Sequence, residues 1–268
     1  MIKQETVYEM RLVSALEKVF LDERPVYRPE CMKLTALKGE TVSFQAACTC
    51  TSFMKNRVKV RIESPISDRI HVRKVENVPA GRVCGPIVDD NYLKTESGLY
   101  PDLLRELVDG EVDIFPQKWR SIWIDIEVTE DVKAGLYPVT VILEKDGETL
   151  ARAAAEVTIY DAVLPRQKIM HTEWFYLDCL ADYYHVPVFS GEHWEIITNY
   201  LKEYVKRGCN MILTPLFTPA LDTAVGIERT TTQLLDVRVE NGNYSFGFDR
   251  VKKWIDLCQS CGIEYFEI

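Results

Sequence analysis

Hydrophobic and polar residues alternate along much of the chain before Pro165. Side chains of a β-strand point alternately to its two faces, so a period of two is typical of strands with one buried face. The clearest alternating runs are Val58–Glu63, Ile122–Val128, Val139–Leu143 and Ala153–Ile159. The last two runs flank Lys145–Glu148, whose glycine predicts a hairpin turn. Short strands at this spacing predict an N-terminal antiparallel β-sandwich domain over residues 1–164.

One part of this region is less regular. Between Cys84 and Trp119 the alternation weakens, and Gly98–Arg105 predicts a long loop with one helical turn.

The pattern changes after Pro165, where hydrophobic residues follow strand and helix periods in turn. Ser190 is a favourable helix N-cap, while Gly208 and Gly262 follow the expected ends of two amphipathic helices. The predicted elements are a strand over 168–176, a helix over about 190–207, a strand over 210–214, a helix from 249 and a strand over 263–268.

Repeated strand–helix units with short helix-to-strand joints predict parallel strands, in either a doubly wound sheet or a (β/α)₈ barrel. The segments after the first two strands, Asp178–Phe189 and Pro215–Ser245, are long. Long loops at that end are typical of barrel enzymes, which build their sites there. We therefore predict a mixed fold, in which residues 165–268 form the first β-α-β-α-β portion of a TIM-like (β/α)8 barrel. Three strands cannot close such a barrel, so the prediction is of a fragment.

The composition limits the kinds of binding partner that we expect for this protein. The 268 residues carry a formal charge of −9, which disfavours binding to nucleic acid or acidic lipid. No apolar run approaches the length of a membrane-spanning helix, and the first ten residues lack the apolar core of a secretory signal. We therefore expect a cytoplasmic protein, with no membrane partner, whose eight cysteines are reduced.

Metal and redox motifs are weak. Cys258 and Cys261 are spaced as a CxxC pair, but they fall at the end of a predicted helix, where a thiolate is not stabilised. His171, His185 and His193 lack the rigid spacing of a zinc site. We predict packing roles for the cysteines and hydrogen bonding within the barrel wall or a pocket floor for His171, with no metal and no cofactor.

A more informative cluster lies where the predicted barrel strands end. Aromatic rings can stack on the apolar face of a sugar, while carboxylates and hydroxyls hold its hydroxyl groups. Because barrel sites lie at this face, the cluster predicts the walls of a substrate pocket. The predicted substrate-binding residues are Trp174, Tyr176, Asp178, Thr214, Thr218 and Glu267.

Three long motifs, Trp174–Tyr184, Asn210–Thr223 and Glu228–Gln233, resemble the family 123 glycoside hydrolases and the bacterial proteins of unassigned function related to them. Ala134–Val141 is similar to the β-sandwich that precedes the barrel in such proteins. The resemblance implies hydrolysis of a β-linked N-acetylhexosamine, such as N-acetylgalactosamine, in a glycan or glycoconjugate. It further implies a retaining mechanism in which the substrate's own acetamido group is the nucleophile, without metal or organic cofactor.

That mechanism implies an adjacent Asp-Glu pair after a later barrel strand, with the glutamate as acid and the aspartate orienting the acetamido group. The only Asp-Glu in this chain is Asp22-Glu23, in the predicted sandwich, and Glu130-Asp131 lies in a predicted turn. Neither pair can be carried over. We therefore assign no catalytic residue to this chain and predict that it is inactive by itself.

Two alternatives remain. The sandwich could be a non-catalytic carbohydrate-binding or assembly module, with Trp119 and Trp123 as an exposed platform opposite the buried isoleucines of 122–126. The partial barrel could instead be completed by a second copy, giving a homo-oligomer through the open barrel edge.

Overall fold

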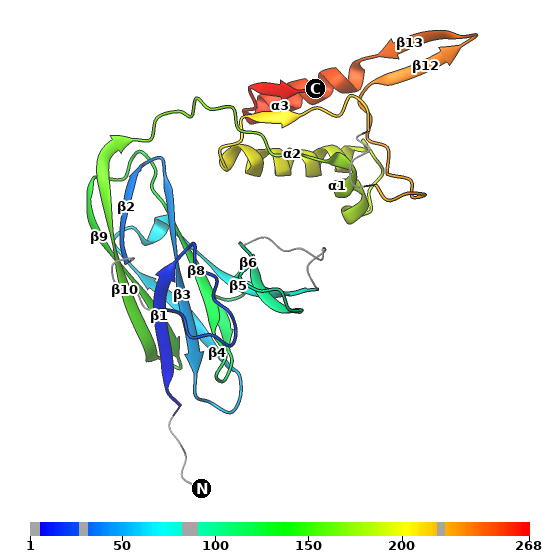
Figure 1. The fold of residues 1–268 in the computed structure, drawn as a ribbon. Helices are drawn as coiled ribbons and strands as arrows, with labels where there is room; N and C mark the ends of the chain where they lie inside the picture. Colours follow the sequence, from blue (N-terminus) through cyan, green and yellow to red (C-terminus); the bar gives the residue numbers. More distant parts are fainter. Residues whose placement is uncertain (1–5, 27–31, 82–90, 219–222) are drawn as a thin grey trace. The chain divides into compact units, whose positions relative to one another are not determined.

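The computed structural model describes residues 6–26, 32–81, 91–218 and 223–268. The chain divides into two compact units, Met1–Pro165 and Arg166–Ile268 (Figure 1).

The first unit contains two five-stranded sheets (Figure 1). In spatial order, the first sheet consists of β1 (Tyr8–Ser14), β3 (Thr41–Cys50), β8 (Arg120–Glu127), β5 (Ile70–Ala80) and β6 (Gly98–Glu106). The second consists of β2 (Lys33–Lys38), β10 (Glu148–Val163), β9 (Gly135–Lys145), β4 (Asn56–Glu63) and β7 (Glu111–Ile114). A short 3₁₀ turn, η2 (Ser67–Arg69), precedes β5.

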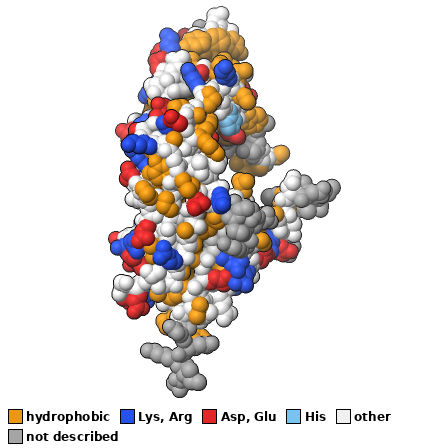
Figure 2. All heavy atoms as spheres, turned by 90° about the vertical axis from the view of Figure 1, so that its left-hand side faces the viewer, with side chains coloured by type: hydrophobic (Ala, Val, Ile, Leu, Met, Phe, Trp, Pro, Cys, Tyr) orange, Lys and Arg blue, Asp and Glu red, His pale blue; other side chains and the backbone are white. Residues whose placement is uncertain are grey.

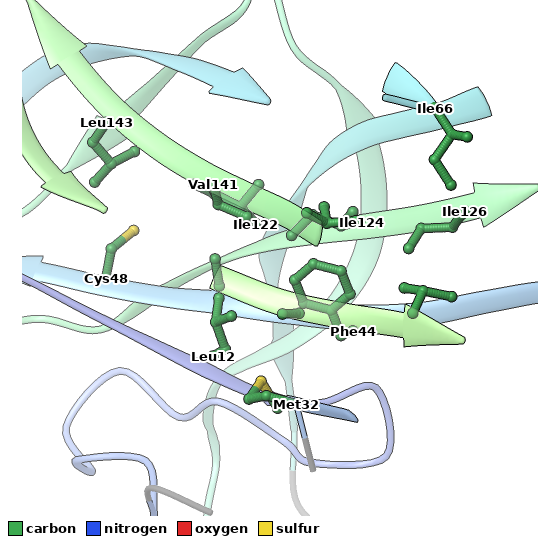
Figure 3. Packing of buried hydrophobic residues seen from close by; sticks show 14 of the residues in the cluster. Leu12, Met32, Phe44, Cys48, Ile66, Ile122, Ile124, Ile126, Val141 and Leu143 are labelled. Atoms are coloured by element: carbon green, nitrogen blue, oxygen red, sulfur yellow. The ribbon is translucent and has the colours of Figure 1, made fainter. Parts of the chain in front are cut away.

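A single apolar core lies between these sheets, because its residues come from strands of both (Figure 3). Phe44 of β3, Ile124 of β8 and Val141 of β9 are fully buried in it. Burial of such side chains contributes about 1.5–3 kcal/mol each. The alternation read along β8 is therefore a true core pattern, and the sandwich prediction is confirmed for this unit.

The predicted hairpin is also confirmed. Strands β9 and β10 pair antiparallel, with Lys145 opposite Glu148. Asp146 and Gly147 between them both have positive φ, +52° and +83°. Positive φ at both central residues is the geometry that matches the twist of a two-residue hairpin.

Two sequence predictions in this unit are wrong, and one of the alternatives loses its basis. Strand β2 pairs with β10 in parallel, so the sandwich is not wholly antiparallel. Gly98–Arg105 lies in strand β6, which pairs with β5, and not in a loop with a helical turn. Trp119 is buried against Val13, Val19 and Ala47, so it cannot form an exposed platform. Cys84 lies outside the described residues.

The second unit has its own apolar core, formed mainly by three helices. Its helices are α1 (Leu177–Tyr184), α2 (Gly191–Lys206) and α3 (Asp249–Cys261). Its strands are β11 (Met211–Leu213), β14 (Tyr265–Glu267) and the hairpin β12 (Asp236–Glu240) and β13 (Asn243–Gly247). Strands β11 and β14 pair in parallel, as the strand–helix repeats predict.

Helix α2 begins at its predicted N-cap residue, and helices α2 and α3 end at their predicted glycines. The Ser190 hydroxyl accepts a hydrogen bond from the His193 backbone N–H at 3.1 Å. Gly262 ends α3 with φ +107°, and Gly208 follows α2 with φ +88°. Both glycines take left-handed conformations that other residues adopt only with strain.

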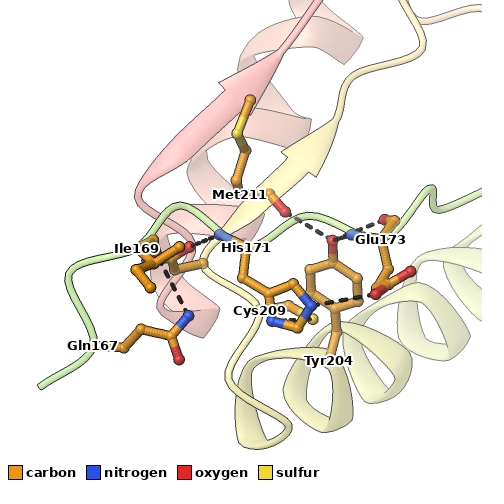
Figure 4. Close-up of polar contacts among 8 residues, drawn as sticks. Gln167, Ile169, His171, Glu173, Tyr204, Cys209 and Met211 are labelled. Atoms are coloured by element: carbon orange, nitrogen blue, oxygen red, sulfur yellow. Dashed lines mark hydrogen bonds and ion pairs between the residues drawn. The ribbon is translucent and has the colours of Figure 1, made fainter.

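The strand predicted over 168–176 is wrong as a regular strand. Only Thr172 forms a bridge, to Met211 of β11, in parallel orientation. The extended segment is instead held by side chains (Figure 4). The Tyr204 hydroxyl of α2 accepts from the Glu173 N–H at 2.7 Å, and the Asn210 amide oxygen accepts from the His171 N–H at 2.8 Å. These bonds place the segment beside β11 without a continuous ladder.

Among the described residues, no helix is long and apolar enough to cross a membrane. Acidic and basic side chains are interspersed over the face that Figure 2 shows, so no single-sign patch forms on it.

Candidate functional site

An aromatic and charged cluster forms before and around the start of α1. Arg229 donates to both carboxylate oxygens of Asp178, from Nε at 2.5 Å and from Nη2 at 3.1 Å. The guanidinium also lies 4.8 Å from the centre of the Tyr176 ring, and Tyr176 meets Trp174 edge-to-face at 6.3 Å. Three of the six predicted pocket residues, Trp174, Tyr176 and Asp178, are therefore in one cluster, with Arg229 at its centre.

Helix α1 and the loop over residues 229–232 hold this cluster in place. Asp178 and Asp182 are four residues apart, so they lie on the same side of α1. Asp178 binds Arg229, and Asp182 accepts a hydrogen bond from the Thr230 hydroxyl at 2.8 Å. The short helix thus presents two carboxylates to one loop and fixes it at two points.

Thr218 lies in the segment after β11, which contacts the loop over residues 229–232. Its hydroxyl accepts from the backbone N–H of Thr232 at 3.1 Å, and Thr232 is buried. The segment over 215–216 also pairs with 234–235 through backbone bonds. Thr218 is therefore connected to the cluster through the same loop that carries Arg229. Asp222, also in the predicted loop, lies outside the described residues.

Thr214 and Glu267 form a second group at the ends of β11 and β14. The Thr214 N–H donates to the Glu267 carbonyl at 2.7 Å. Two of their side-chain atoms, Thr214 Oγ1 and Glu267 Oε2, are buried and have no hydrogen-bond partner among the described residues. Buried polar atoms are nearly always paired in proteins, so this pair marks a place where a polar group can be bound.

Exposure differs among these residues. The Trp174 side chain is 55% exposed, whereas Asp178 and Thr214 are buried. An accessible ring beside fixed polar groups is an arrangement that suits a sugar, whose apolar face stacks while its hydroxyls are hydrogen-bonded.

His193 contacts the backbone at the start of α1, next to the cluster. It is fully buried at the start of α2, where Nδ1 accepts from the Phe189 N–H at 2.9 Å and Nε2 lies 3.0 Å from the Leu177 carbonyl. Burial lowers the pKa of His193 below its usual 6.5, although the bond to Leu177 opposes the shift. The ring is therefore neutral and joins α1 to α2, a structural role and not that of a metal ligand.

The described residues show no group of three or more histidine, cysteine, aspartate or glutamate side chains placed to hold a metal ion. Cys258 is buried in the helical core, and burial raises its pKa well above its usual range. Its thiol is therefore protonated and packs in the core as a small apolar group.

Three of the four carboxylates of the two acidic pairs in the first unit form surface ion pairs. Asp22 contacts Lys118 and Glu23 contacts Lys94. Asp131 contacts Arg69 at 2.7 Å, and it also accepts from the Thr129 hydroxyl.

Two family models match the chain in order. The model described as the glycoside hydrolase 123 N-terminal domain matches residues 20–145, and the glycoside hydrolase 123 catalytic domain matches residues 174–268. The two ranges together cover most of the chain, in the domain order of one family. The chain belongs to glycoside hydrolase family 123. All six predicted pocket residues lie in the range that matches the family's catalytic domain.

Structural comparison agrees with the family. A family 123 glycoside hydrolase from Clostridium perfringens, studied for glycolipid glycan hydrolysis, superposes with a TM-score of 0.70 at 16% identity. The match covers 96% of this chain and 46% of that enzyme, so this chain spans less than half the enzyme's length. At this identity the likeness shows the fold alone.

Other solved structures match less well. The CARDB domain of a Pyrococcus furiosus protein gives a TM-score of 0.29 at 6% identity, covering 58% of this chain and 96% of that one. A β-glucosidase from Listeria innocua gives 0.28 at 11% identity, covering 59% of this chain and 17% of that one. No curated protein sequence matches this family 123 chain.

Proposed function

We propose that this family 123 chain contributes to hydrolysis of a β-linked N-acetylhexosamine, with N-acetylgalactosamine as the favoured sugar. The observation that carries the proposal is the match of both family 123 domains in their order along the chain. The glycan substrate of the Clostridium perfringens relative supports the same class of substrate. The acetamido group of the substrate would act as nucleophile, as in the family.

We further propose that residues 165–268 form the first β-α-β-α-β portion of a TIM-like barrel and residues 1–164 the preceding domain. The parallel pairing of β11 with β14 supports this, as does the parallel bridge from Thr172 to Met211. The predicted pocket residues would then lie at the carboxyl ends of the strands, where barrel enzymes bind substrate.

Within this proposal, Trp174 stacks on the sugar while Asp178, held by Arg229, faces its hydroxyls beside Tyr176. Thr214 and Glu267 offer buried oxygens without partners among the described residues. No adjacent Asp-Glu occurs in residues 166–268, so the 268 residues bind sugar without cleaving it.

The test measures binding and hydrolysis separately. The 268-residue chain is mixed with p-nitrophenyl N-acetyl-β-galactosaminide, and nitrophenol release is followed beside binding of N-acetylgalactosamine by saturation-transfer NMR. We expect binding without release. Trp174→Ala should abolish the binding signal, while Tyr244→Ala, which removes an exposed ring on the β12–β13 hairpin, should not. Release of nitrophenol, or unchanged binding by Trp174→Ala, would contradict this assignment.

Trp119 and Trp123 do not form the exposed platform that the alternative of a carbohydrate-binding sandwich requires. Trp119 is buried, and the half-buried Trp123 donates its ring N–H to Asp125 at 2.7 Å. Assembly through an open barrel edge stays a prediction, for which concentration-dependent sedimentation is the measurement.

A further inference from the structure

A trough runs along strand β6 at the edge of the first sheet. It consists of three adjoining hollows with volumes of about 410, 490 and 50 Å³. The two larger hollows share Phe20, Lys94, Glu96 and Tyr100 in their walls, and the central and smallest share Lys18, Pro101 and Asp102. One wall is the segment between β1 and β2, and the other includes residues 92–96.

The trough exists because of how the outer face of the sheet is covered. The segment after β1 lies over this face, where Gln45 of β3 donates to the carbonyls of Ser14 and Glu17 at 3.0 and 2.8 Å. That segment reaches β6 at Phe20, whose ring contacts Tyr100, and both residues line the two larger hollows.

The floor of the trough is aromatic. Phe20 and Tyr100 meet edge-to-face at 6.1 Å, and the Lys94 ammonium lies 5.0 Å from the Phe20 ring centre. Tyr92 differs from both, because its ring is 50% exposed and makes no ring or cation–π contact among the described residues. One aromatic face is therefore accessible at the wall of the largest hollow.

Two charged side chains of opposite sign line the same place. Lys18 and Asp102 both border the central and smallest hollows, and neither forms an ion pair or hydrogen bond in the described part of the chain. One offers hydrogen-bond donors and the other acceptors. Sugar hydroxyls need both, since each donates one bond and accepts others.

We propose that this trough binds a neutral saccharide chain, separately from the pocket of the second unit. An accessible ring, an apolar floor and an unpaired donor and acceptor are together the chemistry that recognises a sugar. The length along Gly98–Leu104, roughly 20 Å at the rise of a strand, suits an oligosaccharide better than a single ring. The net charge of −9 disfavours an acidic glycan.

An extended peptide is the competing ligand, because β6 is an edge strand that could pair with another strand. Pro101, in the middle of β6, lacks the N–H that such a ladder requires. The walls are also formed by side chains of other segments, and not by the strand edge alone. Both features favour the saccharide.

The test titrates the whole chain with N,N′-diacetylchitobiose and with lactose, by calorimetry, and with an alternating Val-Thr hexapeptide as competitor. We expect one saccharide to bind and Tyr92→Ala to weaken it by about tenfold, equal to roughly 1.4 kcal/mol. Lys18→Ala and Asp102→Asn should each weaken it several-fold. The matched control is Tyr160→Ala, which removes a similarly exposed tyrosine, 53%, from β10 outside the trough. Equal melting temperatures of the variants show that the fold is intact.

Each other outcome overturns the proposal. Binding of neither saccharide, equal weakening by Tyr160→Ala, or binding of the hexapeptide alone would each do so. Loss of binding in Trp174→Ala with full binding in Tyr92→Ala would assign the sugar to the second unit. That result would support the proposed function and would refute the proposal that the trough binds a saccharide.

Discussion

Asp178 and Arg229 form a buried ion pair in the second unit, with side chains 9% and 13% exposed. Two buried charges are costly to bring together, but removing one is costlier because it leaves the other without its partner. We predict that Asp178→Asn lowers the free energy of unfolding by about 3–5 kcal/mol. Urea unfolding monitored by tryptophan fluorescence measures it.

The control is Glu203→Gln, which removes the exposed pair with Arg207 on α2. Exposed pairs contribute at most about 1 kcal/mol, so this variant should unfold nearly as the parent does. If both variants lose the same small amount, the Asp178–Arg229 pair is not a structural element of the site.

His193 gives the second unit a pH dependence of known sign. Its folded pKa is lowered by burial, so the unfolded chain takes up a proton at a higher pH than the folded chain. Stability from this residue is full above pH 6.5 and falls as the pH drops through the unfolded and then the folded pKa. We predict that the melting temperature of the helical unit falls over this window.

His193→Gln should be less stable at neutral pH but should lose less on acidification, and thermal unfolding at a series of pH values compares the two. His71→Gln is the control, because it changes an exposed histidine of the first unit. An unchanged acid slope in His193→Gln would show that other groups cause the dependence.

Sequence reasoning at single residues placed Trp174, Tyr176 and Asp178 correctly next to one another, because they are neighbours in the chain. It named Arg229 only as part of a loop and could not assign it as the partner of Asp178. The two residues are 51 positions apart, and no local pattern encodes such a contact. The sequence also could not predict that side-chain oxygens of Thr214 and Glu267 are buried without hydrogen-bond partners among the described residues, because burial depends on the whole fold.

Among the elements, helices with clear caps were predictable and short or locally irregular ones were not. Helix α1 has eight residues and no side-chain cap, so its pattern could not be distinguished from a loop. The β12–β13 hairpin was missed although its signal was present. Asn241-Gly242 takes φ values of +51° and +80°, the turn that this dipeptide favours between alternating residues.

The Ser190 cap of α2 offers an element-scale prediction. Its hydroxyl satisfies a backbone N–H that has no partner within the helix. We predict that Ser190→Ala lowers the free energy of unfolding by about 1 kcal/mol, with fluorescence-detected urea unfolding as the measurement. Ser245→Ala on the exposed β13 should change it little. A loss in Ser245→Ala equal to that in Ser190→Ala would contradict a capping role.

For the whole molecule, alternation was sufficient to predict the sandwich because each sheet buries one face against the other. The second unit was harder, since its strands are three residues long and its first strand is reduced to one bridge. The order of periods along the chain nevertheless predicted parallel strands separated by helices. The order of strands and helices along the chain can therefore be predicted even when the strands are short, whereas the first and last residues of each element cannot.

The join between the two units is open to a protease. Every residue over 160–170 is exposed, and residues 164–168 belong to no helix or strand. Arg166 and Lys168 are trypsin sites within this stretch, and Arg166 is held only by a surface ion pair with Glu264. Cleavage requires an extended, accessible segment, which the strands and helices on either side do not offer.

We therefore predict that limiting trypsin cuts first after Arg166 or Lys168 and leaves two fragments, one for each unit, identified by mass spectrometry. The double variant Arg166→Gln and Lys168→Gln should slow this first cut many-fold, while Arg152→Gln, within β10, should not. Because each unit has its own buried core, both fragments should resist further cutting at the same protease concentration. A first cut inside either unit, at the same rate in all three proteins, would contradict the division at Pro165.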